Sequence, residues 1–387
     1  MVAKNKDPRA GYYVRQPTGY KAFLPKPLPP EPPIAFDGEF MALLSKADLA
    51  LGRLDGSTET LPNPNRFVFM YVRKEAVLSS QIEGTQASLL DVLEFEAQAL
   101  EEGRRRDVQE VVNYIGAMNY GLDRLRKLPL SLRLIREIHQ RLLKDVRGGE
   151  RTPGEFRRSQ NWIGSSGGTL STALYVPPPP HEMLEAIGAL EKFLHHSPPM
   201  PDLIKIGLIH SQFETIHPFL DGNGRVGRLL IAFLLCERKI LHRPLLYLSY
   251  YFKKRRTEYY DRLQAVRDHG DWEGWLKFFL RGVHEVAEEG RDTARKILRL
   301  REDHRRLIQQ RMRVSAGKAL SILESLYAGP IISVQHAAEV AGVTFPSANS
   351  ILQEFVNLGL LEETTGRKRN RRFSYAPYLA LFQDDAS

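Results

Sequence analysis

Apolar residues recur three and four positions apart along most of this chain, a spacing that places them on one face of a helix. The pattern begins near residue 37 and continues, with one interruption, to about residue 279. It is clearest in four groups: Phe40, Leu43, Leu44 and Leu51; Phe67, Tyr71, Val77 and Ile82; Leu90, Val92, Leu93 and Leu100; and Leu132, Leu134, Ile135, Ile138, Leu142 and Leu143. We therefore predict a mainly α-helical fold.

The interruption, residues 154–180, is the stretch that looks like strand and hairpin. Two runs rich in β-branched and aromatic residues, 156–163 and 172–176, flank a Gly/Ser segment at 164–168. They predict a hairpin with a long loop, and the four prolines at 177–180 prevent it from extending into a larger sheet. Prolines are also dense at 25–33, so residues 1–36 are expected to form an extended arm.

The C-terminal third changes character twice. Residues 283–314 are rich in Arg and Glu with few apolar positions, which predicts a charged connecting helix with a solvated face. After residue 315, three short helical stripes precede two strand-like runs on either side of a basic turn at 366–372, the layout of a winged helix-turn-helix. The predicted units are an arm (1–36), an N-terminal helical domain (37–125), a central core (126–282), the connecting helix (283–314) and the winged helix (315–387).

Composition narrows the setting. At 387 residues the chain is long enough for two or three domains. Its one cysteine, Cys236, lies in an apolar run, which excludes a disulfide framework and a cysteine-based zinc site and predicts a buried side chain. The first 26 residues lack an apolar secretion signal, and no apolar run approaches the ~20 residues of a membrane span, so we expect a cytoplasmic protein with no membrane contact. The net charge of +9 indicates an anionic partner, either nucleotide, nucleic acid or an acidic protein surface.

One polar segment lies between two apolar helical runs and carries the candidate chemistry. Its small residues at 222–224, just before a helix, expose backbone N–H groups that suit an anion. Arg225 and Arg228 lie on the same side of that helix and can bind phosphate oxygens, while Asp221 offers a ligand for a hard cation. His217 can accept a proton from a hydroxyl. The segment reads His217-Pro218-Phe219-Leu220-Asp221-Gly222-Asn223-Gly224-Arg225-Val226-Gly227-Arg228.

This segment resembles the signature of the Fic family, His-x-Phe-x-(Asp/Glu)-Gly-Asn-Gly-Arg-x-x-Arg, at every specified position. The resemblance implies that His217 is the general base for attack of a target hydroxyl on the α-phosphate of ATP, and that Asp221 binds Mg²⁺. It also implies that Arg228 holds the γ-phosphate. The other nucleotide-binding residues implied are Gly222, Asn223, Gly224, Arg225, Val226, Gly227, Tyr259, Tyr260, Ile163 and Gly164.

The resemblance also implies the reaction type and the fold. Family members that act as kinases replace the second glycine of the loop with lysine, whereas this chain keeps Gly224, which favours transfer of AMP over transfer of phosphate. The implied fold is a Fic-type helical bundle with a small β-hairpin flap. The flap, residues 154–180, would receive a segment of the target protein by strand addition. The alternative is a purely structural hairpin.

An upstream segment resembles the inhibitory motif of the same family, Ser/Thr-x-x-x-Glu-(Gly/Asn), through Ser79, Glu83 and Gly84. A pair between Glu83 and Arg228 would occupy the guanidinium that should hold the γ-phosphate. On the predicted helix 256–261, Tyr259 and Tyr260 resemble the adenine side of the site, although helical tyrosines are as often part of a core.

These features together predict a protein adenylyltransferase, autoinhibited by Glu83, that uses ATP and Mg²⁺ to modify a Ser, Thr or Tyr hydroxyl of a target protein or of itself. One alternative is a hydrolase that removes AMP at the same site. The other is a nucleotide-sensing regulator that binds DNA through the winged helix. For DNA, the expected contacts are Ser347, Asn349, Ser350 and Gln353 on the recognition helix and Arg367, Lys368, Arg369, Arg371 and Arg372 on the wing. The other use of such a module is protein contact, so a homodimer stays open.

Overall fold

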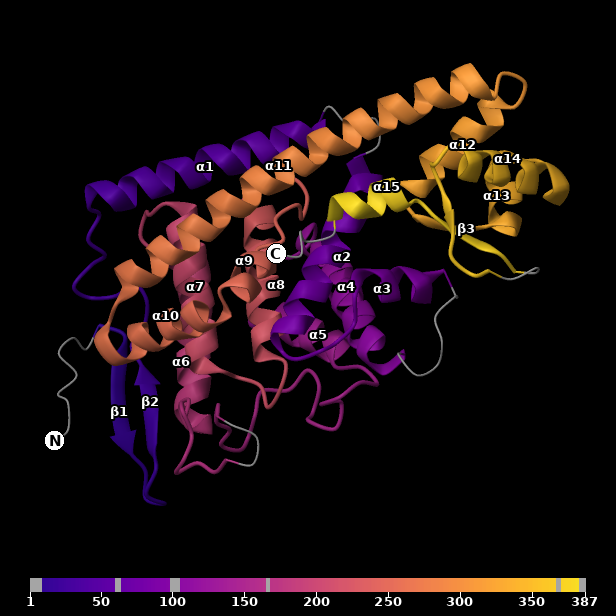
Figure 1. The fold of residues 1–387 in the computed structure, drawn as a ribbon. Helices are drawn as coiled ribbons and strands as arrows, with labels where there is room; N and C mark the ends of the chain where they lie inside the picture. The colour runs from indigo at the N-terminus through magenta and orange to yellow at the C-terminus, as the bar shows by residue number, and fades with distance from the viewer. Residues whose placement is uncertain (1–8, 60–63, 98–104, 165–167, 367–369, 383–387) are drawn as a thin grey trace.

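The computed structural model describes residues 9–59, 64–97, 105–164, 168–366 and 370–382 (Figure 1). The described chain is mostly helical, which confirms the predicted fold class. The helices before residue 272 are α1 (Gly38–Glu59), α2 (Pro64–Ile82), α3 (Leu89–Glu96), α4 (Arg105–Leu125), α5 (Leu132–Leu142), α6 (Pro180–His196), α7 (Asp202–Ile216), α8 (Asn223–Glu237), α9 (Ser249–Lys254) and α10 (Arg256–His269).

Helices α7 and α8 lie in the interior of the bundle. Every residue of α7 from Leu203 to Ile216 is buried, as are nearly all residues of α8, so neither helix has a solvent face. Both helices also bury polar side chains, such as His210 and Glu214 of α7 and Arg228 of α8. The turn between them is therefore held from both sides by buried helices. No helix of the described chain is long and apolar enough to cross a membrane.

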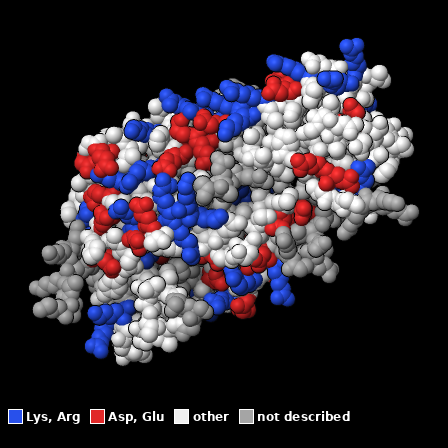
Figure 2. Space-filling view, viewed as in Figure 1, with Lys and Arg blue, Asp and Glu red and all other residues white. Residues whose placement is uncertain are grey.

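The longest helix, α11 (Trp272–Arg311), packs along α1 at one edge of the molecule (Figure 1). Close approach is possible at Gly290, where a Cβ atom would lie 3.2 Å from Cδ1 of Leu54. The predicted connecting helix is the second half of α11. Besides the solvated face that was predicted, this helix has a buried face that contains Val286, Ala287 and Ile297. Figure 2 shows Lys and Arg side chains along the exposed edge of these two helices, with acidic residues among them.

Two strands near the N-terminus correct the prediction of an extended arm. β1 (Gly11–Arg15) and β2 (Lys21–Pro25) form an antiparallel hairpin in which Gly11 is opposite Pro25 and Arg15 is opposite Lys21. The turn between them is closed by hydrogen bonds from Gln16 N to Tyr20 O and from Gly19 N to Gln16 O. Phe23 is fully buried, which ties this hairpin to the bundle.

The two runs predicted to pair at residues 154–180 do meet in antiparallel fashion, but their described residues form no extended strands. The described residues of this segment contain a single antiparallel bridge, between Ile163 and Tyr175, and residues 165–167 lie outside the description. The reason is that the backbone here bonds to the turn between α7 and α8 instead of to a second strand. Arg157 N, for example, donates to Pro218 O at 2.9 Å. The last of the four prolines, Pro180, begins α6.

The C-terminal region contains the three predicted short helices, α12 (Ala316–Leu326), α13 (Val334–Ala341) and α14 (Phe345–Asn357). The strands β3 (Ile331–Ser333), β4 (Glu362–Glu363) and β5 (Arg372–Ser374) form an antiparallel sheet in the order β3-β5-β4, and the chain continues through α15 (Ala376–Leu379) and η2 (Ala380–Phe382). The sequence pattern does not predict β3. Residues 367–369 of the basic turn lie outside the description, and the winged-helix interpretation stays a prediction.

The single cysteine also departs from expectation. Cys236 is half-buried and not fully enclosed by the core. Burial nevertheless raises the pKa of its thiol to about 12, so the thiol stays protonated and unreactive near neutral pH.

Trp275 should be a main determinant of stability. Its ring is fully buried and stacks on His210, and its indole Nε1 donates to Gly207 O at 2.8 Å. Truncation removes this packing and leaves a buried carbonyl without its donor. We expect Trp275→Ala to lower the free energy of unfolding by about 3–5 kcal/mol in urea denaturation followed by circular dichroism. Trp162→Ala, a change of the same residue type at an exposed position, should cost less than about 1 kcal/mol. Equal losses in both variants would contradict this assignment.

Candidate active site

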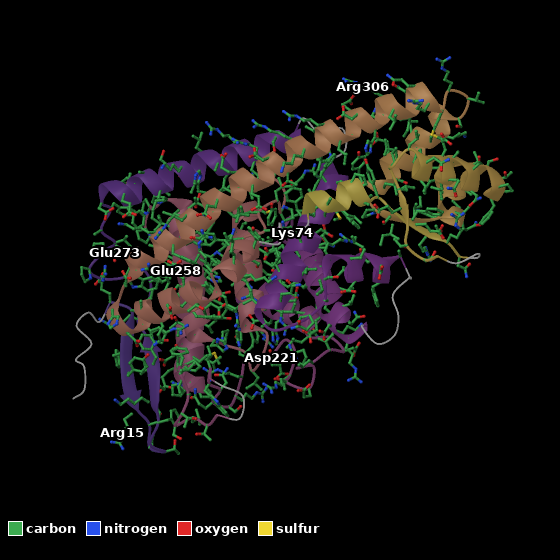
Figure 3. The ribbon with its side chains drawn as sticks, in the orientation of Figure 1. Arg15, Lys74, Asp221, Glu258, Glu273 and Arg306 are labelled. Carbon is green, nitrogen blue, oxygen red and sulfur yellow. The ribbon has the colours of Figure 1, made fainter. Side chains whose placement is uncertain are left out.

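The turn between α7 and α8 begins and ends with left-handed backbone. His217 ends α7 with φ 51° and ψ 59°, and its N–H donates to Phe213 O at 2.9 Å. Gly222 precedes α8 with φ 76°, a conformation that glycine adopts without strain. Six residues, 217–222, therefore reverse the chain between two buried helices. Asp221, labelled in Figure 3, lies at the outer side of this turn.

Side chains of the turn and of α5 hold it in one conformation. The Asn223 amide bonds both backbone groups of Phe219, accepting from its N–H at 2.9 Å and donating to its carbonyl at 2.8 Å. Phe219 is fully buried and stacks on His139 with ring centroids 3.7 Å apart. His139 Nδ1 accepts from Gly154 N, so the ring proton is on Nε2, which donates to Asp221 O at 3.0 Å. Burial lowers the pKa of His139 to about 4, so this neutral tautomer persists at physiological pH.

Arg157 joins the segment 154–180 to the turn, a role that the sequence pattern does not reveal. Its Nε donates to His217 O at 3.0 Å, and its two terminal nitrogens donate to Ser159 O and Pro178 O. The side chain is buried among these carbonyls, and burial lowers its pKa to about 10. Arg158 beside it is exposed, and nothing in the local sequence distinguishes the two arginines.

The His217 imidazole is neutral and has one free nitrogen. Burial, together with the positive charge of Arg267, lowers its pKa to about 4. Nδ1 lies 3.4 Å from the Glu214 carbonyl, which can only accept, so the ring proton is on Nδ1 and the lone pair is on Nε2. Arg267 is itself held by Thr215 Oγ1 and by the Tyr175 ring, 3.8 Å from its guanidinium carbon. The arrangement suits a group that accepts a proton.

Arg225 presents buried donors at the beginning of α8. Its side chain is 2% exposed and lies 3.5 Å from a Glu110 oxygen and 3.6 Å from an Asp221 oxygen. Nε and Nη1 of this guanidinium have no hydrogen-bond partner among the described residues. Buried donors without partners are costly, and an anion at this helix N-terminus would satisfy them. Asp221 Oδ1 accepts from Gly222 N at 2.6 Å, and the Asp221 side chain is one-third exposed.

Arg228 is bound by α2. Its Nε donates to Ser79 Oγ at 2.8 Å, and its Nη2 donates to Ser79 O at 3.0 Å and to Glu83 Oε1 at 2.7 Å. Burial alone would raise the pKa of Glu83, but the guanidinium outweighs it, and the net pKa lies below the usual range. A Cβ atom on Gly224 would lie 2.3 Å from Glu83 Oε1, so the carboxylate fills the space over that glycine. The predicted residues Ser79 and Glu83 therefore meet Arg228 directly. Gly84 follows at the end of α2 with φ 97°.

The remaining predicted residues divide between core and surface. Tyr259 is buried, and its hydroxyl lies 2.9 Å from His210 Nε2, whose ring bonds the Gly227 carbonyl through Nδ1. Its neighbour Tyr260 is 40% exposed. Val226 is fully buried. Ile163 is the bridge residue opposite Tyr175, with Gly164 next to it, and the Tyr175 hydroxyl donates to Thr215 O just before His217.

Comparison with known proteins agrees with this geometry. Residues 41–123 match the Fic/DOC family N-terminal domain, and residues 129–235 match the Fic/DOC family domain. Over 186 residues, 47% of this chain, the sequence is 30% identical to the protein adenylyltransferase Fic of Drosophila ananassae and 31% identical to that of Drosophila virilis. The matched regions cover only 33% and 34% of those relatives.

A solved structure extends the likeness of fold to most of the chain. The crystal structure of a Fic family protein from Desulfovibrio desulfuricans G20 has a TM-score of 0.57 at 19% identity, over 89% of this chain and 97% of that one. This chain therefore contains the N-terminal and central domains of the Fic/DOC family, in that order.

Proposed function

We propose that this chain is a Fic-type protein adenylyltransferase that transfers AMP from ATP to a hydroxyl side chain of a target protein or of itself. One observation carries the proposal. A neutral histidine, whose Nε2 has no hydrogen-bond partner among the described residues, and a buried arginine, whose Nε has none either, lie at the two ends of the same turn. A nucleophilic hydroxyl needs the first, and the phosphates of a nucleotide need the second.

In the proposed reaction, His217 Nε2 accepts the proton of the target hydroxyl while the hydroxyl oxygen attacks the α-phosphorus of ATP. A new oxygen–phosphorus bond forms, the bond to the β-phosphate oxygen breaks, and pyrophosphate leaves. The Arg157 contact to His217 O fixes the backbone that carries the base. Positioning of this kind supplies much of the rate in phosphoryl-type transfers.

The phosphates would bind at the beginning of α8. The Arg225 guanidinium, whose Nε and Nη1 make no hydrogen bond among the described residues, and the N–H groups at 222–224 would supply the positive end of the site. Gly224 leaves room for them, because it places no side chain beside Arg228. From the presence of this glycine we infer that the chain transfers AMP and not phosphate.

Mg²⁺ fits this site as a companion of the nucleotide. The residues that the structure describes contain no group of three or more His, Cys, Asp or Glu side chains placed to hold a metal ion. Mg²⁺ commonly binds through one carboxylate plus substrate phosphates, and Asp221 is the carboxylate of the turn. When bound, the ion would neutralise phosphate charge.

The same proposal makes Glu83 an inhibitor. Its carboxylate bonds Arg228 and fills the space over Gly224, so the γ-phosphate of ATP would meet a negative charge instead of a free guanidinium. The nucleotide could then bind only with its α-phosphate misplaced.

Removal of AMP is the second candidate activity, because the one-third exposed Glu83 side chain can orient a water molecule at the same site. Incubation with a pre-adenylylated protein separates the two reactions.

The target would bind at the bridge between Ile163 and Tyr175. Both backbone groups of Ile163 bond to the Tyr175 side, with Ile163 N donating at 2.8 Å. Alternate residues of an antiparallel pair direct their backbone groups to opposite edges, so Trp162 and Gly164 offer the free edge for an added strand.

DNA binding by the C-terminal region stays a prediction. There, Asn349 and Gln353 of α14 already accept hydrogen bonds from Arg371.

Glu83→Gly should raise AMP incorporation by at least roughly tenfold, because it frees Arg228 for the γ-phosphate. Intact-mass measurement after incubation with ATP and Mg²⁺ detects an adduct of the mass of AMP. Glu83→Gln keeps the shape of the side chain but removes its charge, so its activity should lie between wild type and Glu83→Gly. Equal adduct formation in all three proteins would exclude the inhibitory role.

His217→Ala in the Glu83→Gly background should reduce AMP incorporation by about 10²–10⁴-fold, the usual contribution of a general base. The matched control is His181→Ala, which removes an exposed histidine of α6 and should leave the rate unchanged. Incorporation that survives the loss of His217 would remove it as the base.

The pH dependence of kcat/KM for ATP in the Glu83→Gly variant should report the lowered pKa of His217 in the free enzyme. The base must be neutral, and in the free enzyme it stays neutral until the pH falls to about 4. The value of kcat/KM should therefore remain flat from about pH 8 to about pH 6, where an ordinary imidazole with a pKa of about 6.5 would lose activity. Arg267→Met removes a positive charge and should move the acidic limb to higher pH, whereas Arg267→Lys should keep it. An unshifted limb in Arg267→Met would contradict this electrostatic role.

A further inference from the structure

The β1–β2 hairpin continues the proposed target-binding flap. Phe23 N of β2 donates to Val176 O at 2.9 Å, next to the bridge residue Tyr175, and the Phe23 and Tyr175 rings are 6.3 Å apart. At the turn of the hairpin, the Tyr20 hydroxyl donates to Gln160 Oε1 at 3.4 Å. Two segments separated by about 150 residues of sequence thus form one surface.

A shallow hollow of about 380 Å³ lies where the hairpin turn meets the flap. Its lining carries no charge and combines aromatic, hydroxyl and small residues: Thr18, Tyr20, Trp162, Thr169, Leu170 and Ser171. Trp162 is 42% exposed, which is high for a tryptophan beside the site of strand addition. It directly precedes the bridge residue Ile163, so the hollow adjoins the edge at which a strand would be added.

The hairpin ends in two like charges that face each other across the strands. Arg15 and Lys21 are direct partners in the register of β1 and β2, and both are exposed. Neither has an ion-pair partner among the described residues. Like charges at directly opposite positions destabilise a strand pair, and an anionic partner would relieve that cost. In Figure 2, a blue group lies at the lower left end of this face, next to uncharged atoms, where Figure 3 labels Arg15.

We infer that the hollow and the basic end of the hairpin bind an acidic segment of the substrate protein that carries a bulky apolar side chain. The inference rests on the proposed function, because it extends the target strand at Ile163 onto the hairpin. The apolar side chain would pack on Trp162, and Asp or Glu residues next to it would pair with Arg15 and Lys21. The occupant is a protein segment because the adjoining flap offers a strand edge, which main-chain amides of a polypeptide can match.

Fluorescence anisotropy with the full-length chain tests this surface without requiring catalysis. The probes are two labelled 15-residue peptides with the same Thr-containing β-prone centre and one Phe, flanked either by Asp and Glu or by Lys. We expect the acidic peptide to bind wild type at least fivefold more tightly than the lysine peptide. Arg15→Glu with Lys21→Glu should abolish or reverse that preference, and Trp162→Ala should weaken both peptides.

A matched charge control separates a local effect from the net charge of the protein. Arg126→Glu with Lys127→Glu makes the same change in formal charge at an exposed site after α4 and should leave the preference intact. If the hairpin charge reversals unfold the chain, Arg15→Gln with Lys21→Gln replaces them. No preference in wild type, or equal loss in the control, would overturn the inference. Tighter binding of a single-stranded DNA oligonucleotide than of the acidic peptide would also overturn the inference, if Arg15→Glu with Lys21→Glu abolishes the binding of that DNA.

The proposed function can fail independently of this surface. Formation of the AMP adduct by the Glu83→Gly variant tests the proposed function without either peptide. Absence of any AMP adduct in Glu83→Gly would reject the proposed adenylyltransferase activity. The preference for the acidic peptide would still test the docking surface. An adduct together with peptides bound equally well would reject only the docking surface.

Discussion

The bonds between Arg228 and α2 are the contacts on which the rest of the active site depends. A guanidinium buried in the core needs a compensating charge, and leaving one partner of such a pair alone costs about 3–5 kcal/mol. Two other carboxylates are near, but burial raises the pKa values of Glu75 and Glu214 to about 7 each, so neither is fully ionised at neutral pH. Glu83, whose pKa is lowered, is the carboxylate that neutralises Arg228. A nucleotide that binds productively must supply that negative charge in its place.

The packing of α2 limits how Glu83 can leave. Behind the active site, Phe67 stacks on Tyr327, Tyr71 meets Phe382 edge to face, and Lys74 lies 3.5 Å from Glu289. These contacts to α11 and the C-terminal region hold most of the helix. The last turn is held less firmly, because Glu83 N and Gly84 N bond three residues back, and Gly84 ends the helix in a conformation suited to glycine. We expect release to unwind this turn and leave the rest of α2 in place.

The parts of the site that could be predicted are those that the chain makes locally. The turn 217–222 and the beginning of α8 follow from consecutive residues, and Glu83 could be paired with Arg228 because both belong to recognisable motifs. Arg157 and His139 could not be found, since their roles depend on carbonyls and rings brought together by the fold. The β1–β2 hairpin had a signal, with Tyr12 to Val14 and Ala22 to Leu24 on either side of a Pro-Thr-Gly turn. The dense prolines at 25–33 led instead to the prediction of an extended arm over residues 1–36. The expected strands at 154–180 failed because Arg157 and Asn161 bond the turn instead.

The lowered pKa of His217 describes the site before nucleotide binds, and this resolves an apparent conflict. A group with a pKa near 4 is a weak base, yet the proposed reaction needs it to accept a proton from a hydroxyl. The phosphates of ATP would bring several negative charges close to the imidazole, and nearby negative charge raises the pKa of a histidine. Burial, with the charges of Arg267 and Arg157, therefore keeps the ring neutral while the site is empty, and the substrate itself would make the ring more basic. The base then gains strength only when there is an α-phosphate to be attacked.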